Sequence, residues 1–92
     1  MKFAVCATNF GSWSDPQVAV RTARAAQAAG WDGYFVWDHL AFVWGPPSAD
    51  PWVTLAAVAC ATEGLTLGTA LTPLPRRRPH VVAQQLATLW RV

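Results

Sequence analysis

The chain has 92 residues, a length that allows one small domain with a marginal hydrophobic core. Hydrophobic residues make up 53% of the chain and charged residues 13%, well below the roughly 25% of an average soluble domain, so much of the surface should be buried or meet a partner. A net charge of +2 without a basic stripe argues against nucleic-acid binding, and no apolar run approaches the ~18 residues of a membrane span. We therefore expect a soluble, cytoplasmic protein.

The N-terminal part of the chain predicts a strand followed by a helix. Residues 2–8 form a short apolar run, typical of a strand that is buried on both faces. Asp15 and Pro16 predict a helix start, because the carboxylate can cap free amide groups and proline lacks the N–H that would be unpaired there. The helix is expected to run to Ala29 and to stop at Gly30, since glycine readily adopts the left-handed conformation after a helix end.

The same strand–helix pattern occurs twice more. Residues 33–39 predict a second strand, and Asp50 and Pro51 predict the start of a second helix. Residues 65–71 predict a third strand, and Pro79 opens a third helix. The order β-α-β-α-β-α, with crossovers long enough for parallel pairing, predicts an α/β fold that is either an open doubly wound sheet or a sector of a barrel.

The two cysteines show no metal-ligand spacing. Cys6 and Cys60 both lie in apolar runs and form no CxxC pair. We expect them to be reduced thiols buried in the core of a cytoplasmic protein.

Four segments resemble the luciferase-like monooxygenase family in the same order and register. Residues 29–40 read AGWDGYFVWDHL, and residues 50–57 contain DPW followed by LAA. Residues 67–73 read LGTALTP, and residues 76–89 begin with RRRP and end with QLATL. The resemblance covers nearly the whole chain.

The resemblance implies a (β/α)₈ TIM barrel that uses FMN or a deazaflavin coenzyme of the F-420 type. Members carry out monooxygenation of a small organic substrate with reduced flavin and oxygen, or hydride transfer to the deazaflavin. A complete barrel needs roughly 250 residues, so residues 1–92 are interpreted as the truncated N-terminal portion of such a domain, with reduced or no activity alone.

His39 and Asp38 are the candidate catalytic residues. They end the second predicted strand, and functional groups of barrels lie at the carboxyl ends of strands. An imidazole can take a proton or hydrogen-bond a reduced flavin, and the resemblance implies that His39 is the base beside the flavin ring. The residues alone favour a surface or capping histidine at this position, and the resemblance reverses that interpretation. Asp38 could orient His39, face a neighbouring strand, or be a structural hydrogen-bonding carboxylate.

Further candidate residues come from the loops and the third strand. Trp44 is a candidate for the substrate pocket or for covering the flavin. By resemblance, Ala70, Leu71 and Thr72 bind the cofactor, and a bulge with a non-proline cis peptide between Ala70 and Leu71 supports the central flavin ring.

The remaining charged residues leave alternatives open. The arginines at 76–78 precede the third helix and could meet an anionic cofactor tail or form a solvated loop. Asp38 and His39 supply two possible metal ligands, and Glu63 lies at a predicted helix end. No third ligand is evident, so no metal centre is expected.

Two further functions compete with an enzymatic one. A non-catalytic half-barrel remnant or subunit could act by self-association or by pairing with a full-length barrel, and an unrelated small α/β module is a weaker option. Three parallel strands would leave two open edges and an apolar face, which favours a homo-oligomer.

Overall fold

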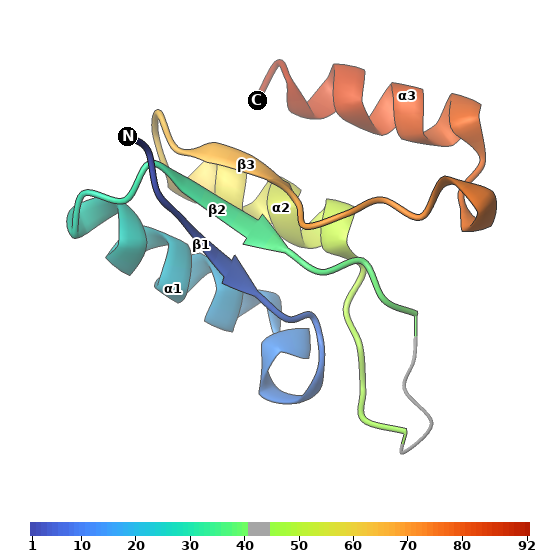
Figure 1. The fold of residues 1–92 in the computed structure, drawn as a ribbon, viewed down its shortest axis with the longest axis horizontal. Coiled ribbons are helices and arrows are strands. Elements are labelled where there is room, and N and C mark those ends of the chain that lie inside the picture. Colours follow the sequence, from blue (N-terminus) through green and yellow to red (C-terminus); the bar gives the residue numbers. More distant parts are fainter. Residues whose placement is uncertain (41–44) are drawn as a thin grey trace.

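Three parallel strands form one sheet in the order β1-β2-β3, as Figure 1 shows. A computed structural model describes residues 1–40 and 45–92. The strands are β1 (Ala4–Ala7), β2 (Gly33–Val36) and β3 (Thr66–Thr69). The helices are α1 (Pro16–Ala28), α2 (Pro51–Ala61) and α3 (Pro79–Leu89), with short 3₁₀ turns η1 (Gly11–Ser14) and η2 (Leu74–Arg76). Within the described ranges, no helix is both long and apolar enough to cross a membrane.

The predicted helix signals are confirmed. The Asp15 carboxylate accepts a hydrogen bond from the Gln17 amide at 2.9 Å, and the Asp50 carboxylate accepts one from the Val53 amide, also at 2.9 Å. Gly30 has a φ of 87°, the left-handed conformation expected after the end of α1. The predicted alternation of three strands and three helices is therefore correct, with ends that differ by only a few residues.

The arrangement of the layers distinguishes between the two α/β architectures. Strand order follows chain order, and α1 and α2 lie on the same face of the sheet. Helix α3 joins this layer, because its Val82 and Leu89 pack on the core formed with Trp52 of α2. A doubly wound sheet has helices on both faces, so this pattern is that of consecutive units of a βα barrel.

The core lies between the sheet and the helices. On the strands, Tyr34 and Val36 of β2 point into this layer, and Tyr34 is fully buried. The helices contribute small and branched side chains, among them Ala23 of α1 and Leu55 and Val58 of α2. Because successive strand residues point to opposite faces, the residues between these core positions point away from the helices.

No described helix covers the second face of the sheet. Cys6, Phe35 and Gly68 lie side by side on it in register. A Cβ atom on Gly68 would come within 2.6 Å of the Phe35 ring, and one on Gly33 within 3.1 Å. The two glycines therefore let the Phe35 ring lie against the sheet. We call this surface the open face.

The prediction of buried thiols is wrong. Cys6 and Cys60 are both free and exposed. Cys6 points to the open face, whereas the apolar run around it suggested a strand covered on both faces. Cys60 lies near the end of α2, outside the core cluster.

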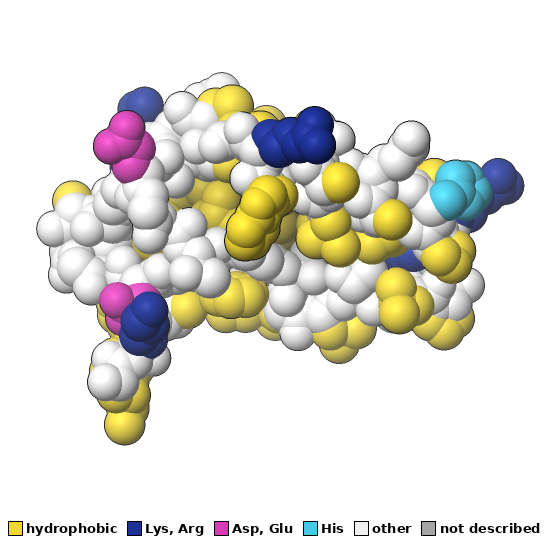
Figure 2. Space-filling view, turned by 90° about the horizontal axis from the view of Figure 1, so that it is seen from above, with side chains coloured by type: hydrophobic (Ala, Val, Ile, Leu, Met, Phe, Trp, Pro, Cys, Tyr) yellow, Lys and Arg dark blue, Asp and Glu magenta, His cyan; other side chains and the backbone are white. Residues whose placement is uncertain are grey.

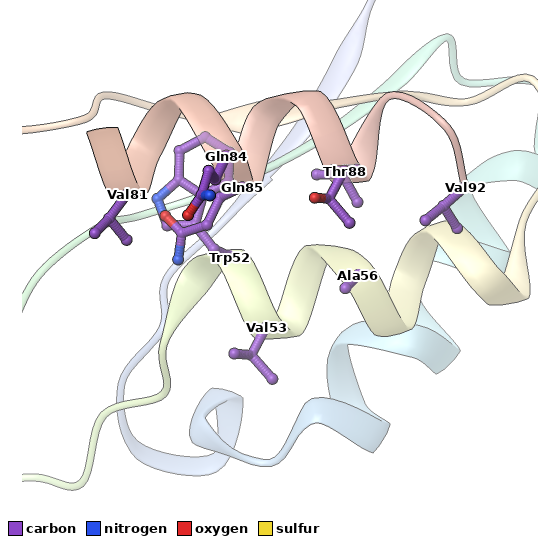
Figure 3. Close-up of a pocket in the computed structure, with 9 residues that line it drawn as sticks. Trp52, Val53, Ala56, Val81, Gln84, Gln85, Thr88 and Val92 are labelled. Atoms are coloured by element: carbon purple, nitrogen blue, oxygen red, sulfur yellow. The ribbon is translucent and has the colours of Figure 1, made fainter. Parts of the chain in front are cut away.

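The helix layer is less tightly closed at α3. A groove of about 550 Å³ runs between α2 and α3, with Trp52 and Gln85 among its lining side chains (Figure 3). Its lining contains no acidic, basic, histidine or cysteine side chain, so it offers no acid–base chemistry. In the view of Figure 2, hydrophobic groups are frequent on the surface and charged ones are few, in line with the low charge content.

Candidate functional site

The carboxyl ends of the three strands meet at one edge of the sheet. The Trp37 amide donates to the Ala7 carbonyl at 3.0 Å, which holds the end of β2 against β1. The Ala70 amide donates to the Val36 carbonyl at 2.7 Å, which holds the residue after β3 against β2. All predicted site residues within the described ranges lie at this edge or just beyond it.

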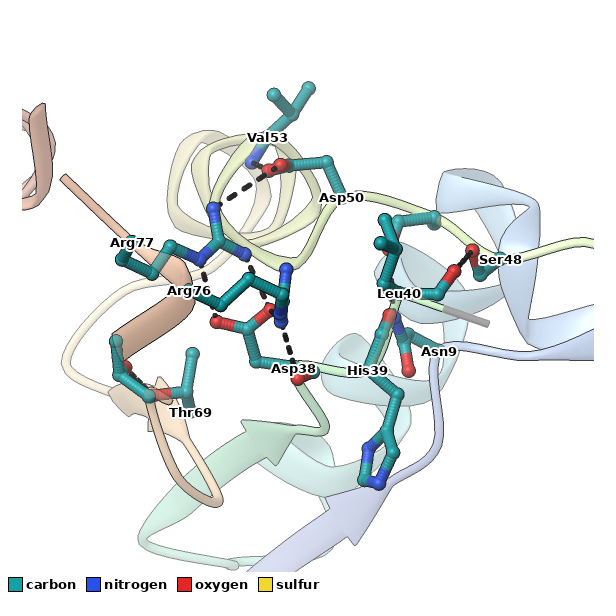
Figure 4. A network of polar contacts seen from close by, with 12 residues as sticks. Asn9, Asp38, His39, Leu40, Ser48, Asp50, Val53, Thr69, Arg76 and Arg77 are labelled. Atoms are coloured by element: carbon teal, nitrogen blue, oxygen red, sulfur yellow. Dashed lines mark hydrogen bonds and ion pairs between the residues drawn. The ribbon is translucent and has the colours of Figure 1, made fainter. Parts of the chain in front are cut away.

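Asp38 is buried among arginines. Its side chain is fully buried, and its carboxylate accepts a hydrogen bond from Arg76 at 2.7 Å and one from Arg77 Nε at 3.0 Å (Figure 4). A second nitrogen of Arg77 also contacts the carboxylate, and Arg76 donates to the Asp38 backbone carbonyl at 2.8 Å. The end of β2 is thereby tied to the loop between β3 and α3.

The cluster extends to the start of α2. Arg77 also lies 3.8 Å from the Asp50 carboxylate, which caps that helix. Burial alone would raise the pKa of the Asp38 carboxyl, but hydrogen bonds and positive charge from Arg77 and Arg76 outweigh it and hold this pKa below its usual value. The pairing also raises the pKa of Arg77. Asp38 is therefore an ionised carboxylate that is hydrogen-bonded to both Arg76 and Arg77.

The interpretation of the arginines as a solvated loop is wrong for Arg77, whereas Arg76 is exposed and also paired with Asp38. Both side chains bind Asp38, and the Arg77 side chain is only 14% exposed. Arg78, the residue before α3, is exposed. No local pattern indicates this ion cluster, because Arg76 and Arg77 lie 38 and 39 residues from Asp38 along the chain. The geometry favours the structural interpretation of Asp38, and its catalytic role stays a prediction.

His39 points the opposite way from Asp38. It is exposed, and its ring centroid lies 5.4 Å from that of Trp37 and 5.7 Å from that of Phe10. Figure 4 shows its ring turned away from the arginine cluster. Alternation along the extended chain accounts for this difference, since Asp38 continues the helix-facing side of β2 and His39 the open face. An exposed imidazole at a strand end is suited to proton transfer with a bound molecule.

The residues after β3 form an apolar surface at the same edge. Leu71 is 64% exposed, and Ala70 is exposed as well. The Thr72 hydroxyl pairs with that of Thr69 at 2.7 Å. The expected cis peptide between Ala70 and Leu71 is absent, because all peptide bonds of the described residues are trans. Trans is the ordinary form, and a cis bond persists only where surrounding structure enforces it.

The structure leaves Trp44 untested and shows no metal cluster in its described residues. Trp44 lies outside the described residues, so its assignment to the substrate pocket stays a prediction. In residues 1–40 and 45–92, no three histidine, cysteine, aspartate or glutamate side chains are grouped closely enough to hold a metal ion.

Asn9 is a site residue that sequence reasoning missed. It is only 3% exposed, and its side-chain amide donates to the backbone carbonyls of His39 and Ala49. In the sequence it lies between the first predicted strand and the first predicted helix, where a loop is expected. Its position directly after the first strand, at the edge where functional groups gather, was the available signal.

These features define a parallel βα protein of the barrel type with a candidate site at the carboxyl edge of its strands. The model of the luciferase-like monooxygenase family matches residues 1–92. The chain therefore belongs to the luciferase-like monooxygenase family.

Two curated relatives are similar to the chain. An F420-dependent glucose-6-phosphate dehydrogenase from Beutenbergia cavernae is 49% identical over 70 residues, which cover 70% of this chain and 20% of the relative. An enzyme of the same name from Nakamurella multipartita is 40% identical over 80 residues, which cover 80% of this chain and 23% of the relative. The chain thus spans about a fifth of the length of the curated relatives it matches.

Proposed function

We propose that the chain supplies the first three βα units of a deazaflavin- or flavin-dependent oxidoreductase, with His39 as the acid–base group beside the cofactor ring. The observation that carries this proposal is the exposed imidazole of His39 at the carboxyl edge of a family-matched barrel sector. Both curated relatives are F420-dependent, which favours a deazaflavin over FMN. Their names make a sugar phosphate the first small organic substrate to test.

The residues at this edge suit a flat aromatic cofactor. Exposed apolar groups at Ala70 and Leu71 offer a surface for a ring, and the Trp37 ring lies beside His39. A bound deazaflavin would supply the hydride acceptor. His39 would then take the proton of the substrate hydroxyl as the hydride leaves, which is ordinary work for an imidazole near neutral pH.

In this proposal Asp38 has a structural role: it lies on the helix side of the sheet and holds the loop after β3 in place. Its carboxylate is occupied by Arg76 and Arg77, so it is a poor proton acceptor. The ion cluster instead fixes the loop that follows Leu71 and Thr72 relative to the end of β2.

Two exposed free thiols, Cys6 and Cys60, suit the reducing cytoplasm.

Cofactor binding by the purified chain tests the proposal. Fluorescence titration with an F420-type deazaflavin and with FMN is expected to show binding, tighter for the deazaflavin. His39→Ala should weaken it about tenfold, the effect of losing one hydrogen bond to a charged or polarised group. His80→Ala is the matched control, because His80 is exposed in the first turn of α3, and it should leave binding unchanged. Absence of binding to either cofactor by the folded chain would refute a cofactor site in this chain.

Self-association is a second candidate function, favoured by the open face and by two sheet edges. Strands β1 and β3 each pair on one side only within the described sheet, and several large apolar side chains are exposed, Leu71 and Trp90 among them. Sedimentation velocity over a range of concentrations should show a homo-oligomer. A monomer at all concentrations would leave only the cofactor-binding proposal.

A further inference from the structure

Asn9 holds the chain at both ends of the loop that follows His39. Its side-chain Nδ2 donates to the His39 carbonyl at 2.9 Å and to the Ala49 carbonyl at 2.8 Å. The Ala49 amide returns a bond to the Asn9 carbonyl at 2.9 Å. One buried residue of the segment after β1 therefore fixes where the loop leaves β2 and where it returns toward α2.

We propose that Asn9 is a positioning residue for His39. A role of Asn9 in catalysis rests on the function proposed above. Its hydrogen bond to the His39 carbonyl does not depend on that function. The residue after it, Phe10, is buried and places its ring 5.7 Å from that of His39. The same short segment thus holds the backbone of His39 through Asn9 and lies against its imidazole through Phe10.

A short, uncharged amide side chain suits this pair of contacts. A carboxamide carries two N–H donors on one nitrogen, and here both acceptors are backbone carbonyls. The two carbonyls also fix the orientation of the amide, because a flipped Asn9 would direct its oxygen at two other oxygens. Aspartate has nearly the same shape but no donor when ionised, so it would repel both carbonyls.

Within the described residues, the side-chain contacts of Asn9 are made by its nitrogen. Its Oδ1 is buried and accepts no hydrogen bond from the described residues. The side chain is instead arranged around the two carbonyls that set the position of His39.

The test is an NMR comparison of wild type, Asn9→Asp and Asn9→Ala. In wild type, the His39 ring should show nuclear Overhauser contacts to the rings of Phe10 and Trp37. Both variants should lose these contacts and shift the His39 ring signals. The Phe3 and Trp31 rings, 6.4 Å apart near the opposite edge of the sheet, report whether the fold persists, and their contact should remain.

Ser48→Ala is the matched control. The Ser48 hydroxyl donates to the Leu40 carbonyl at 2.7 Å, so this variant removes another hydrogen bond at the base of the same loop without touching His39. It should keep the His39 ring contacts. Retention of these contacts in Asn9→Asp, or their equal loss in Ser48→Ala, would overturn the proposal.

A measurement on wild type decides the case in which the Asn9 variants do not fold. Both side-chain amide hydrogens of Asn9 should exchange with solvent at least tenfold more slowly than those of the exposed Gln17. Exchange as fast as that of Gln17 would contradict the two hydrogen bonds and the proposal with them.

Cofactor titration of the same variants separates this proposal from the proposed function. If wild type binds the deazaflavin, Asn9→Asp should weaken binding about as much as His39→Ala, and the double variant should add little, because both changes remove the same interaction. If the double variant loses as much as the two single variants combined, Asn9 does not act through His39. If wild type binds no cofactor, the proposed function fails, and the ring contacts alone decide the role of Asn9.

Discussion

The two faces of the sheet differ more than their strands do. The same three strands form both faces, yet one is closed by helices around Tyr34 and Leu55. The other carries the half-buried Phe35 and the exposed Cys6 and His39. Burial on the helix side stabilises the fold through apolar contacts. The open face has no described helix against it and carries His39, the candidate acid–base group. Stability and the candidate chemistry of this protein are therefore separated by the alternation of side chains along each strand.

The largest expected difference is in stability, between a leucine-to-alanine substitution in the core and one at the exposed site edge. Leu55→Ala removes a fully buried side chain from the helix face and should lower the free energy of unfolding by about 2–5 kcal/mol. Leu71→Ala, at the exposed edge, should change it by no more than about 0.5 kcal/mol. Urea unfolding followed by tryptophan fluorescence measures both. Similar losses would mean that the site edge also belongs to the core.

Removal of the Asp38 carboxylate should lower stability, because the ion cluster joins the helix layer to the site edge. Asp38→Ala leaves Arg77, whose side chain is largely buried, without its main partner, and should cost about 3 kcal/mol in the free energy of unfolding. Asp32→Ala is the control, because the Asp32 carboxylate accepts one exposed hydrogen bond from the Phe3 amide and should matter far less. An Asp38→Ala protein as stable as wild type would show that the cluster is dispensable for folding.

The pH dependence of stability refines this comparison. Because the pKa of Asp38 is lowered in the folded state, its contribution is present above the unfolded value of about 4 and is lost as pH falls through the folded pKa. The free energy of unfolding of wild type should therefore fall more steeply below about pH 4 than that of Asp38→Asn. Parallel urea titrations at pH 7 and at low pH give the two slopes, and equal slopes would exclude a lowered pKa.

The smallest expected effect lies within the core itself. The Tyr34 hydroxyl is buried without a hydrogen-bond partner among the described residues, and burial, with a contribution from Cys6, raises its pKa to about 12. Tyr34→Phe removes an unsatisfied polar group and should leave stability unchanged or raise it by up to about 1 kcal/mol. Thermal unfolding can detect such a change, and a loss above 1 kcal/mol would reveal a partner for the hydroxyl.

Local signals account for what could be predicted of the fold. Asp15 and Asp50 cap their helices, and Gly30 ends α1 as expected, because each signal depends on interactions within a few residues of the chain. The position of His39 at a strand end followed from the same local pattern. The family match over residues 1–92 confirms the resemblance of the four short segments, while the complete barrel and its cofactor stay predictions.

The sequence by itself determined the order of the elements and the starts of the helices, and it predicted the edge at which a site would lie. Only the tertiary structure decided that the helices share one face, that Asp38 binds Arg76 and Arg77, and that both cysteines are exposed. It also brought Asn9 to His39, 30 residues away. These contacts join segments that no local pattern relates, because they depend on which strand lies beside which and on the face to which each side chain turns.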